Sequence, residues 1–220
     1  NKLPPSRPAN TLQEKQRDLQ YVQEYRPENG DIKHLRILLY GPVGGGKSSF
    51  INSVSTVMRG RTTIPAAASA TTSDTSFTRQ KRKRKPKDIL PAFVFNDMMG
   101  LEEGSDSGVR ADDIKLSLVK IICSSTQNTE LISVSAGIPQ MAIVTNIDTA
   151  CGEIEKDLKN VYKSKHLRKK FSKSVGIPMN CICPVKNYSD EIEIDDDVDS
   201  LILSALRLMI HFGDDFIEDM

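Results

Sequence analysis

The chain has 220 residues, 38% of them hydrophobic, which excludes wholesale disorder and leaves room for one full domain plus an extension. Its formal charge of +1 hides one basic and one acidic segment. No apolar stretch reaches the roughly 18 residues of a membrane span, and the polar start is no secretory signal. Four cysteines without C-x-x-C spacing favour buried thiols and a cytoplasmic protein.

Two parts are expected: an N-terminal extension with a polar helix over residues 1–33, and a domain over residues 34–220. A capping-box pattern at Thr11 and Glu14 predicts the helix over 11–25. The near-continuous apolar run at 35–40 predicts a central strand buried on both faces of a parallel sheet. After a glycine-rich loop, apolar residues at helical spacing predict a helix that ends at Gly60.

Further strands alternate with helices along the rest of the chain. Strands are predicted at 92–95, 141–145 and 181–185, with an edge strand around 75–78. Helices are predicted from 112 toward 120, over 153–173 and over 198–216. This alternation predicts an α/β fold built on a doubly wound, mostly parallel sheet.

The glycine-rich loop at residues 41–48 matches the phosphate-binding pattern G-x-x-x-x-G-K-[ST]. Its glycines let backbone N–H groups turn toward phosphate oxygens at the start of the following helix, while Lys47 reaches the β and γ phosphates. Ser48 is expected to hold Mg²⁺. The predicted phosphate-binding residues are Gly41, Gly44, Gly45, Gly46, Lys47, Ser48 and Ser49. The alternative is a glycine-rich turn that binds no nucleotide.

An apolar strand followed by Asp97-x-x-Gly100 is the second signal. We expect Asp97 to reach Mg²⁺ through water and the Gly100 N–H to contact the γ-phosphate, as in P-loop nucleotidases. Asp97 as a simple turn cap is the alternative. Among the threonines of the preceding loop, Thr72 is predicted to close on Mg²⁺ and the γ-phosphate.

Residues 145–148, Thr-Asn-Ile-Asp, occupy the place of the guanine-reading sequence N-K-x-D. Asp148 accepts hydrogen bonds from the N1–H and the amine of guanine, a donor pair that adenine lacks, so the prediction is GTP or GDP. Thr145 replaces the usual Asn, and Asn146 is too short to cover the base as Lys does. Val185 and Lys186 follow the last strand, where a backbone N–H is expected to reach the guanine O6. Asp148 as a helix cap is the alternative.

These motifs and their surroundings resemble the interferon-induced protein 44 family, in particular its 44-like members. The resemblance covers residues 35–54, 93–103, 137–148 and 201–219. It implies a cytoplasmic, interferon-inducible domain of GTPase-like type, with the fold of a P-loop NTPase (a Ras-like G domain), connected with antiviral defence.

The resemblance also implies a long loop and another core strand before residue 137. Here only 30 positions separate Leu101 from Leu131. Either residues 118–123 supply that strand, or residues are absent from the chain near 119–123. We expect the second, with an abrupt join there.

Hydrolysis is expected to be weak because Leu101 stands where Ras-like enzymes carry a water-orienting Gln. Glu102 and Glu103 would repel a triphosphate, so no catalytic residue is assigned. The sequence predicts a GTP-binding switch with weak hydrolysis unless a homodimer forms across the nucleotide face, where Arg61, Arg79 or the run from Lys81 to Lys87 of the second copy would act in trans. A scaffold that works without nucleotide is the alternative.

A basic run at residues 79–87 carries seven cations: Arg79, Lys81, Arg82, Lys83, Arg84, Lys85 and Lys87. Such a run supplies salt-dependent affinity for nucleic acid. Phe77 is the only aromatic residue nearby, so a solvated loop is favoured and nucleic-acid binding stays the alternative.

Overall fold

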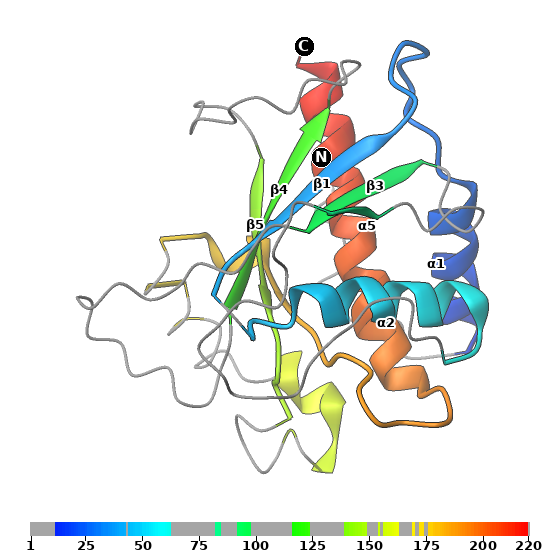
Figure 1. Ribbon diagram of the computed structural model, residues 1–220, viewed down its shortest axis with the longest axis vertical. Helices are drawn as coiled ribbons and strands as arrows, with labels where there is room; N and C mark the ends of the chain where they lie inside the picture. Colours follow the sequence, from blue (N-terminus) through cyan, green and yellow to red (C-terminus); the bar gives the residue numbers. More distant parts are fainter. Residues whose placement is uncertain are drawn as a thin grey trace.

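The computed structural model describes residues 12–42, 44–62, 82–84, 92–97, 116–123, 139–148, 154, 156–162, 169, 172–173 and 176–219. Six strands form one sheet in the order β2-β3-β1-β4-β5-β6 (Figure 1). The strands are β1 (Leu35–Tyr40), β2 (Arg82–Arg84), β3 (Phe93–Asp97), β4 (Leu116–Cys123), β5 (Gln140–Val144) and β6 (Ile182–Pro184). The helices are α1 (Leu12–Glu24), α2 (Lys47–Arg59) and α5 (Asp196–Glu218), with short 3-10 helices η1 (Leu158–Tyr162) and η2 (Met179–Cys181). Within these ranges, no helix combines the length and apolar character needed to cross a membrane.

The sheet is mixed, whereas a mostly parallel sheet was expected. β1 is parallel to β3 and β5 is parallel to β6, but β4 runs antiparallel to both β1 and β5, and β2 antiparallel to β3. Leu39 of β1 pairs with Asp97 at the end of β3, and Tyr40 pairs with Leu118 near the start of β4. The first residues of β4 therefore lie at the same end of the sheet as the last residues of β1 and β3. Antiparallel pairing needs no crossover of the sheet there.

Two predictions for the region around β4 are wrong. Residues 116–120, expected at the end of a helix, belong to the strand, and the β-branched residues Val119, Ile121 and Ile122 favour that conformation. The expected join near 119–123 is instead continuous strand, paired with β1 from Leu35 to Tyr40. Of the two explanations that the sequence left open, residues 118–123 do supply a strand beside β1.

Other predicted elements lie close to the observed ones, with two differences. The edge strand β2 falls inside the basic run, while residues 75–78 lie outside the described part of the chain. In the stretch 153–173, the described residues 154, 156, 169, 172 and 173 are α-helical as predicted, but residue 157 and the 3-10 helix η1 interrupt the single long helix that was expected.

The main core lies between one face of the sheet and the helices α2 and α5. Leu35, Ile37 and Leu39 of β1 point to this face together with Phe93 and Phe95 of β3, and all five are buried. They pack against the apolar sides of α2 and α5, which cross one another in Figure 1. A second buried cluster joins Ala142 and Val144 of β5 to Ile154 and Val161.

Helix α1 belongs to the same packed unit as the rest of the described chain. Val22 and Tyr25 are buried in the main core, and α1 lies beside α5 (Figure 1). Arg207 Nη1 donates to both carboxylate oxygens of the buried Asp18, at 2.8 and 2.9 Å. The Tyr25 hydroxyl donates to Asp214 at 2.5 Å. The helix expected in the N-terminal extension is therefore docked on α5.

Candidate nucleotide-binding site

Three glycines in the loop between β1 and α2 have positive φ values. Gly41, Gly44 and Gly46 have φ values of 149°, 69° and 77°, which side chains rarely tolerate. Gly46 is the N-cap of α2, and neither a capping side chain nor an acidic residue occupies the start of this helix. No acidic side chain of the first turn of α2 therefore offsets the partial positive charge of the helix N-terminus. That charge suits an anionic ligand.

Lys47 is buried at the start of α2, with 7% of its surface exposed. Its Nζ donates to the carbonyl oxygens of Gly41 at 3.0 Å and Pro42 at 2.7 Å. Burying an ammonium group is costly unless hydrogen bonds replace its water. The two carbonyls supply such bonds and hold the cation against the loop.

The segment after β5 contacts the loop directly. Thr145 is fully buried, and its hydroxyl donates to the carbonyl of Gly45 at 3.2 Å. Asn146 is exposed and has a φ of 55°, a left-handed conformation in which Asn is several-fold enriched. That backbone conformation gives a structural reason for Asn where the pattern has Lys. Asp148 follows the buried Ile147 and is half-buried.

The segment after β6 reaches the same place. The Val185 N–H donates to the carbonyl of Val144 at 2.8 Å, so this N–H is used by the sheet and the expected contact with guanine falls to Lys186. Lys186 Nζ lies 2.9 Å from a carboxylate oxygen of Glu191. Burial favours the neutral form of Lys186, but the hydrogen bond to Glu191 and the charges of Glu191 and Asp148 outweigh it and raise the pKa of Lys186. The Asn187 amide donates to the Gly46 carbonyl at 3.2 Å.

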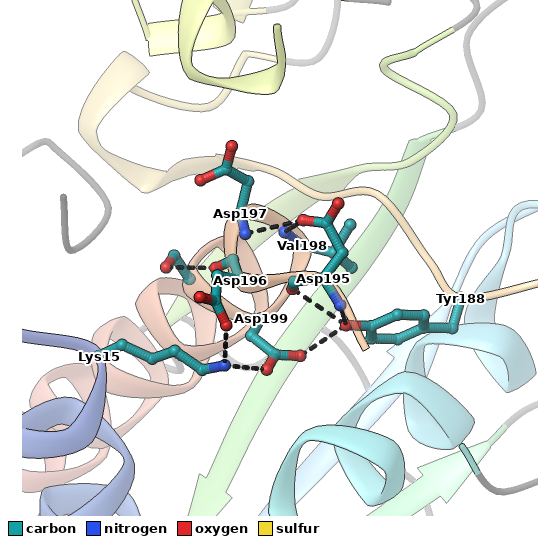
Figure 2. A network of polar contacts seen from close by, with 8 residues as sticks. Lys15, Tyr188, Asp195, Asp196, Asp197, Val198 and Asp199 are labelled. Atoms are coloured by element: carbon teal, nitrogen blue, oxygen red, sulfur yellow. Dashed lines mark hydrogen bonds and ion pairs between the residues drawn. The ribbon is translucent and has the colours of Figure 1, made fainter. Parts of the chain in front are cut away.

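Asn187 and Tyr188 make contacts near the glycine loop that the sequence patterns did not predict. The Tyr188 N–H donates to Ser53 Oγ of α2 at 2.9 Å. Its hydroxyl donates to Asp199 at 2.7 Å and accepts from the Asp195 N–H at 2.8 Å (Figure 2). Burial and the neighbouring Asp199 carboxylate raise the pKa of Tyr188, so the hydroxyl stays protonated. No local motif marks these residues, because the partners that join them to α2 and the glycine loop, Ser53 and Gly46, lie 135 and 141 positions away in the sequence.

The same network explains part of the acidic segment, which is residues 190–199. Asp195 caps α5 by accepting hydrogen bonds from the N–H groups of Asp197 and Val198 at 2.8 and 3.0 Å. Acidic side chains at a helix N-terminus are favoured by the helix dipole. Lys15 of α1 pairs with Asp196 at 2.6 Å and with Asp199 at 2.5 Å (Figure 2).

The remaining predicted site residues are only partly described. Ser48 and Ser49 lie in the first turn of α2. Asp97 is the last residue of β3 and pairs with Leu39 of β1. Leu39 precedes the start of the glycine loop, Gly41, by two residues. Thr72, Gly100 and residues 101–103 lie outside the described residues. In the described part of the chain, no group of three or more His, Cys, Asp or Glu residues could hold a metal ion. The Mg²⁺ expectation stays with Ser48, Asp97 and Thr72.

The side chains present fit an anionic ligand that carries a hydrogen-bonding ring. Glycine N–H groups, the α2 N-terminus and Lys47 suit phosphates. Asp148 and Lys186 lie in the two segments whose neighbouring residues, Thr145 and Asn187, bond the Gly45 and Gly46 carbonyls of the loop.

Curated relatives match most of this chain. It is 29% identical to human interferon-induced protein 44-like, over 90% of this chain and 56% of the relative. It is 30% identical to human interferon-induced protein 44 and 26% identical to the mouse protein of that name, over 92% of this chain in both cases. The chain therefore spans less than two thirds of each of these relatives, 57% and 60% for the last two. No family model and no solved structure matches it.

The aligned region is longer in the relatives than in this chain. The alignment with the human 44-like protein runs over 255 positions but covers 90% of this chain, about 198 of its 220 residues, so more than 50 aligned positions have no counterpart here. The relatives thus carry at least that many positions that this chain lacks. Relatives that match about nine tenths of this chain are thus named interferon-induced protein 44 or 44-like, and these matches support its place in that family.

Proposed function

We propose that this chain binds guanine nucleotides with Mg²⁺ and acts as a switch in the interferon-induced antiviral response. The fold proposed for it is that of a P-loop NTPase, doubly wound and Ras-like, with β4 reversed. One observation carries the proposal. Side chains from two segments distant in sequence, Thr145 and Asn187, hold consecutive carbonyls of the glycine loop, those of Gly45 and Gly46. In a nucleotide site, phosphate-binding and base-binding segments must meet in this way.

Each part of the nucleotide has residues suited to it. The N–H groups at residues 44–48 and the Lys47 ammonium would hold the phosphates, with Ser48 and Asp97 on the side of Mg²⁺. Bound Mg²⁺ would neutralise phosphate charge. Asp148 would accept the two hydrogen bonds that distinguish guanine from adenine. The charge of Asp148 also helps to raise the pKa of Lys186, and the Lys186 ammonium pairs with the Glu191 carboxylate.

Calorimetric titration with GDP, GTP and ATP in the presence of Mg²⁺ tests this function. Lys47→Ala should remove most of the affinity, because it deletes the cation that the loop holds at its own carbonyls. The exposed Lys156 offers a matched control, since Lys156→Ala changes the net charge equally and should leave binding intact. Equal competition by ATP and GTP would contradict the guanine assignment.

Base recognition has a separate test. Asp148→Asn should weaken GDP and improve the binding of xanthosine diphosphate, because xanthine replaces the guanine amine with a carbonyl acceptor. An Asp148→Asn variant with unchanged preference would show that Asp148 does not face the base.

A scaffold that works without nucleotide is the second candidate. Two observations favour it: the Lys47 ammonium is bonded to the carbonyls of Gly41 and Pro42, and Asn146 lacks the long stem that covers a base. Wild-type protein that binds neither GDP nor GTP at millimolar concentration would decide for the scaffold.

A further inference from the structure

We infer that Asn187, although it lies in the loop expected to read the base, acts on the phosphate site. Its amide is a positioning group that aims the backbone N–H of Lys47. This inference rests on the proposed function, since it assigns a residue to the phosphate half of that same site.

The geometry of one peptide group carries the argument. The Gly46 carbonyl and the Lys47 N–H belong to the same planar peptide and point in opposite directions. The carbonyl accepts two hydrogen bonds, from the Phe50 N–H at 2.8 Å and from Asn187 Nδ2 at 3.2 Å. Together they define the orientation of the plane. The Lys47 N–H is thereby directed away from Asn187, out of the N-terminal end of α2, where the helix dipole favours an anion.

Asn187 acts from a support that is independent of the glycine loop. Its neighbour Tyr188 is bonded through its N–H to Ser53 and through its hydroxyl to Asp199. Asp199 is in turn paired with Lys15 of α1, as Figure 2 shows. The brace on the Gly46 carbonyl is therefore anchored on α2, α5 and α1, outside the loop that it orients.

The contact is close, and it is separate from the base-reading groups. A Cβ at Gly46 would lie 2.8 Å from Asn187 Nδ2, so glycine is the residue that admits the amide. Thr145 makes the equivalent bond to the Gly45 carbonyl. The bond from the Asn187 amide to the Gly46 carbonyl involves neither the Asp148 carboxylate nor the pair between Lys186 and Glu191.

The test compares two ligands in the full chain, GDP and inorganic pyrophosphate, both with Mg²⁺. Asn187→Ala should weaken both by the same factor, about fivefold for the loss of one neutral hydrogen bond. The preference for GDP over ADP should not change. Asn180→Ala is the matched control, because Asn180 is exposed in η2 and bonds no loop carbonyl in the described structure. Unchanged pyrophosphate affinity, or a lost preference for GDP, would overturn the inference.

A second measurement and a second variant guard against a folding defect. In ligand-free protein, hydrogen exchange at the Phe50 amide, whose N–H donates to the Gly46 carbonyl, should quicken in Asn187→Ala while the α5 amides keep their protection; an unchanged Phe50 rate would contradict the inference. Asn187→Asp keeps the shape but cannot donate to Gly46, and it should weaken pyrophosphate binding relative to wild type even at high salt, where the added charge is screened. Wild-type protein that binds neither ligand would refute the proposed function and this inference with it. Normal wild-type binding with an unaffected variant would refute the inference alone.

Discussion

Glycines stand at both ends of helix α2, Gly46 before it and Gly60 after it. Substituting each of them would measure how tightly the glycine loop is held. Gly46 at the start and Gly60 after the end both have left-handed backbones, with φ of 77° and 61°. An alanine in that conformation costs about 1 to 2 kcal/mol. At Gly60 a Cβ would meet nothing within 4 Å, whereas at Gly46 it would lie 2.8 Å from Asn187 Nδ2 and 3.0 Å from Thr145 Cγ2.

The difference between the two substitutions isolates the contacts of the loop. Gly60→Ala should lower the free energy of unfolding by about 1 to 2 kcal/mol, the backbone cost alone. Gly46→Ala should lose about 1 kcal/mol more, because the Asn187 amide must move and give up its bond to Gly46. The entropy that alanine removes from the unfolded chain is the same at both positions and cancels.

Urea denaturation followed by circular dichroism would measure both variants against wild type. For a chain of this size the extra 1 kcal/mol corresponds to a further decrease in Tm of about 2 to 4 °C. Equal destabilisation by Gly46→Ala and Gly60→Ala would refute the reasoning, since it would mean that Asn187 and Thr145 do not hold the loop.

Three further predictions follow from the network and the site. Tyr188→Phe should destabilise the protein by about 1.5 to 3 kcal/mol in urea denaturation, because it removes a hydrogen bond to the buried Asp199 carboxylate. Tyr40→Phe removes a hydroxyl whose contact with Gln140 is long, at 3.4 Å, and exposed, so it should have little effect; equal losses would contradict this. Although burial alone would raise it, hydrogen bonds from Ser189 and Lys186 lower the pKa of Glu191 from 4.5 to about 2, so its stabilisation is complete above pH 4.5 and is lost as the pH falls through 2; in unfolding measurements across that window, Glu191→Gln should show a smaller dependence on pH than wild type. GTP hydrolysis, followed as phosphate release, should be no faster than about 10⁻⁴ s⁻¹ in dilute protein and should rise with protein concentration; fast turnover at every concentration would reveal a catalytic group within one chain.

Local sequence determined the elements whose signals lie in consecutive residues. The apolar run of β1, the glycine loop, the helical spacing of α2 and its end at Gly60 all follow from neighbours along the chain. The same holds for α1 and α5, whose predicted bounds differ from the observed ones by at most two residues. Such signals are readable because a strand or a helix repeats its contacts every few residues.

Tertiary structure alone decided the direction of β4, the strand at Arg82–Arg84, and the role of Asn187. A largely apolar segment of eight residues such as Leu116–Cys123, which also contains Ser117 and Lys120, suits a helix or a strand until a neighbouring strand offers hydrogen bonds. The Asn187 amide and the Gly46 carbonyl are 141 positions apart, and Arg207 and Asp18 are 189 apart. Contacts over such separations leave no periodic trace in the sequence, because they depend on which surfaces meet when the sheet and helices pack.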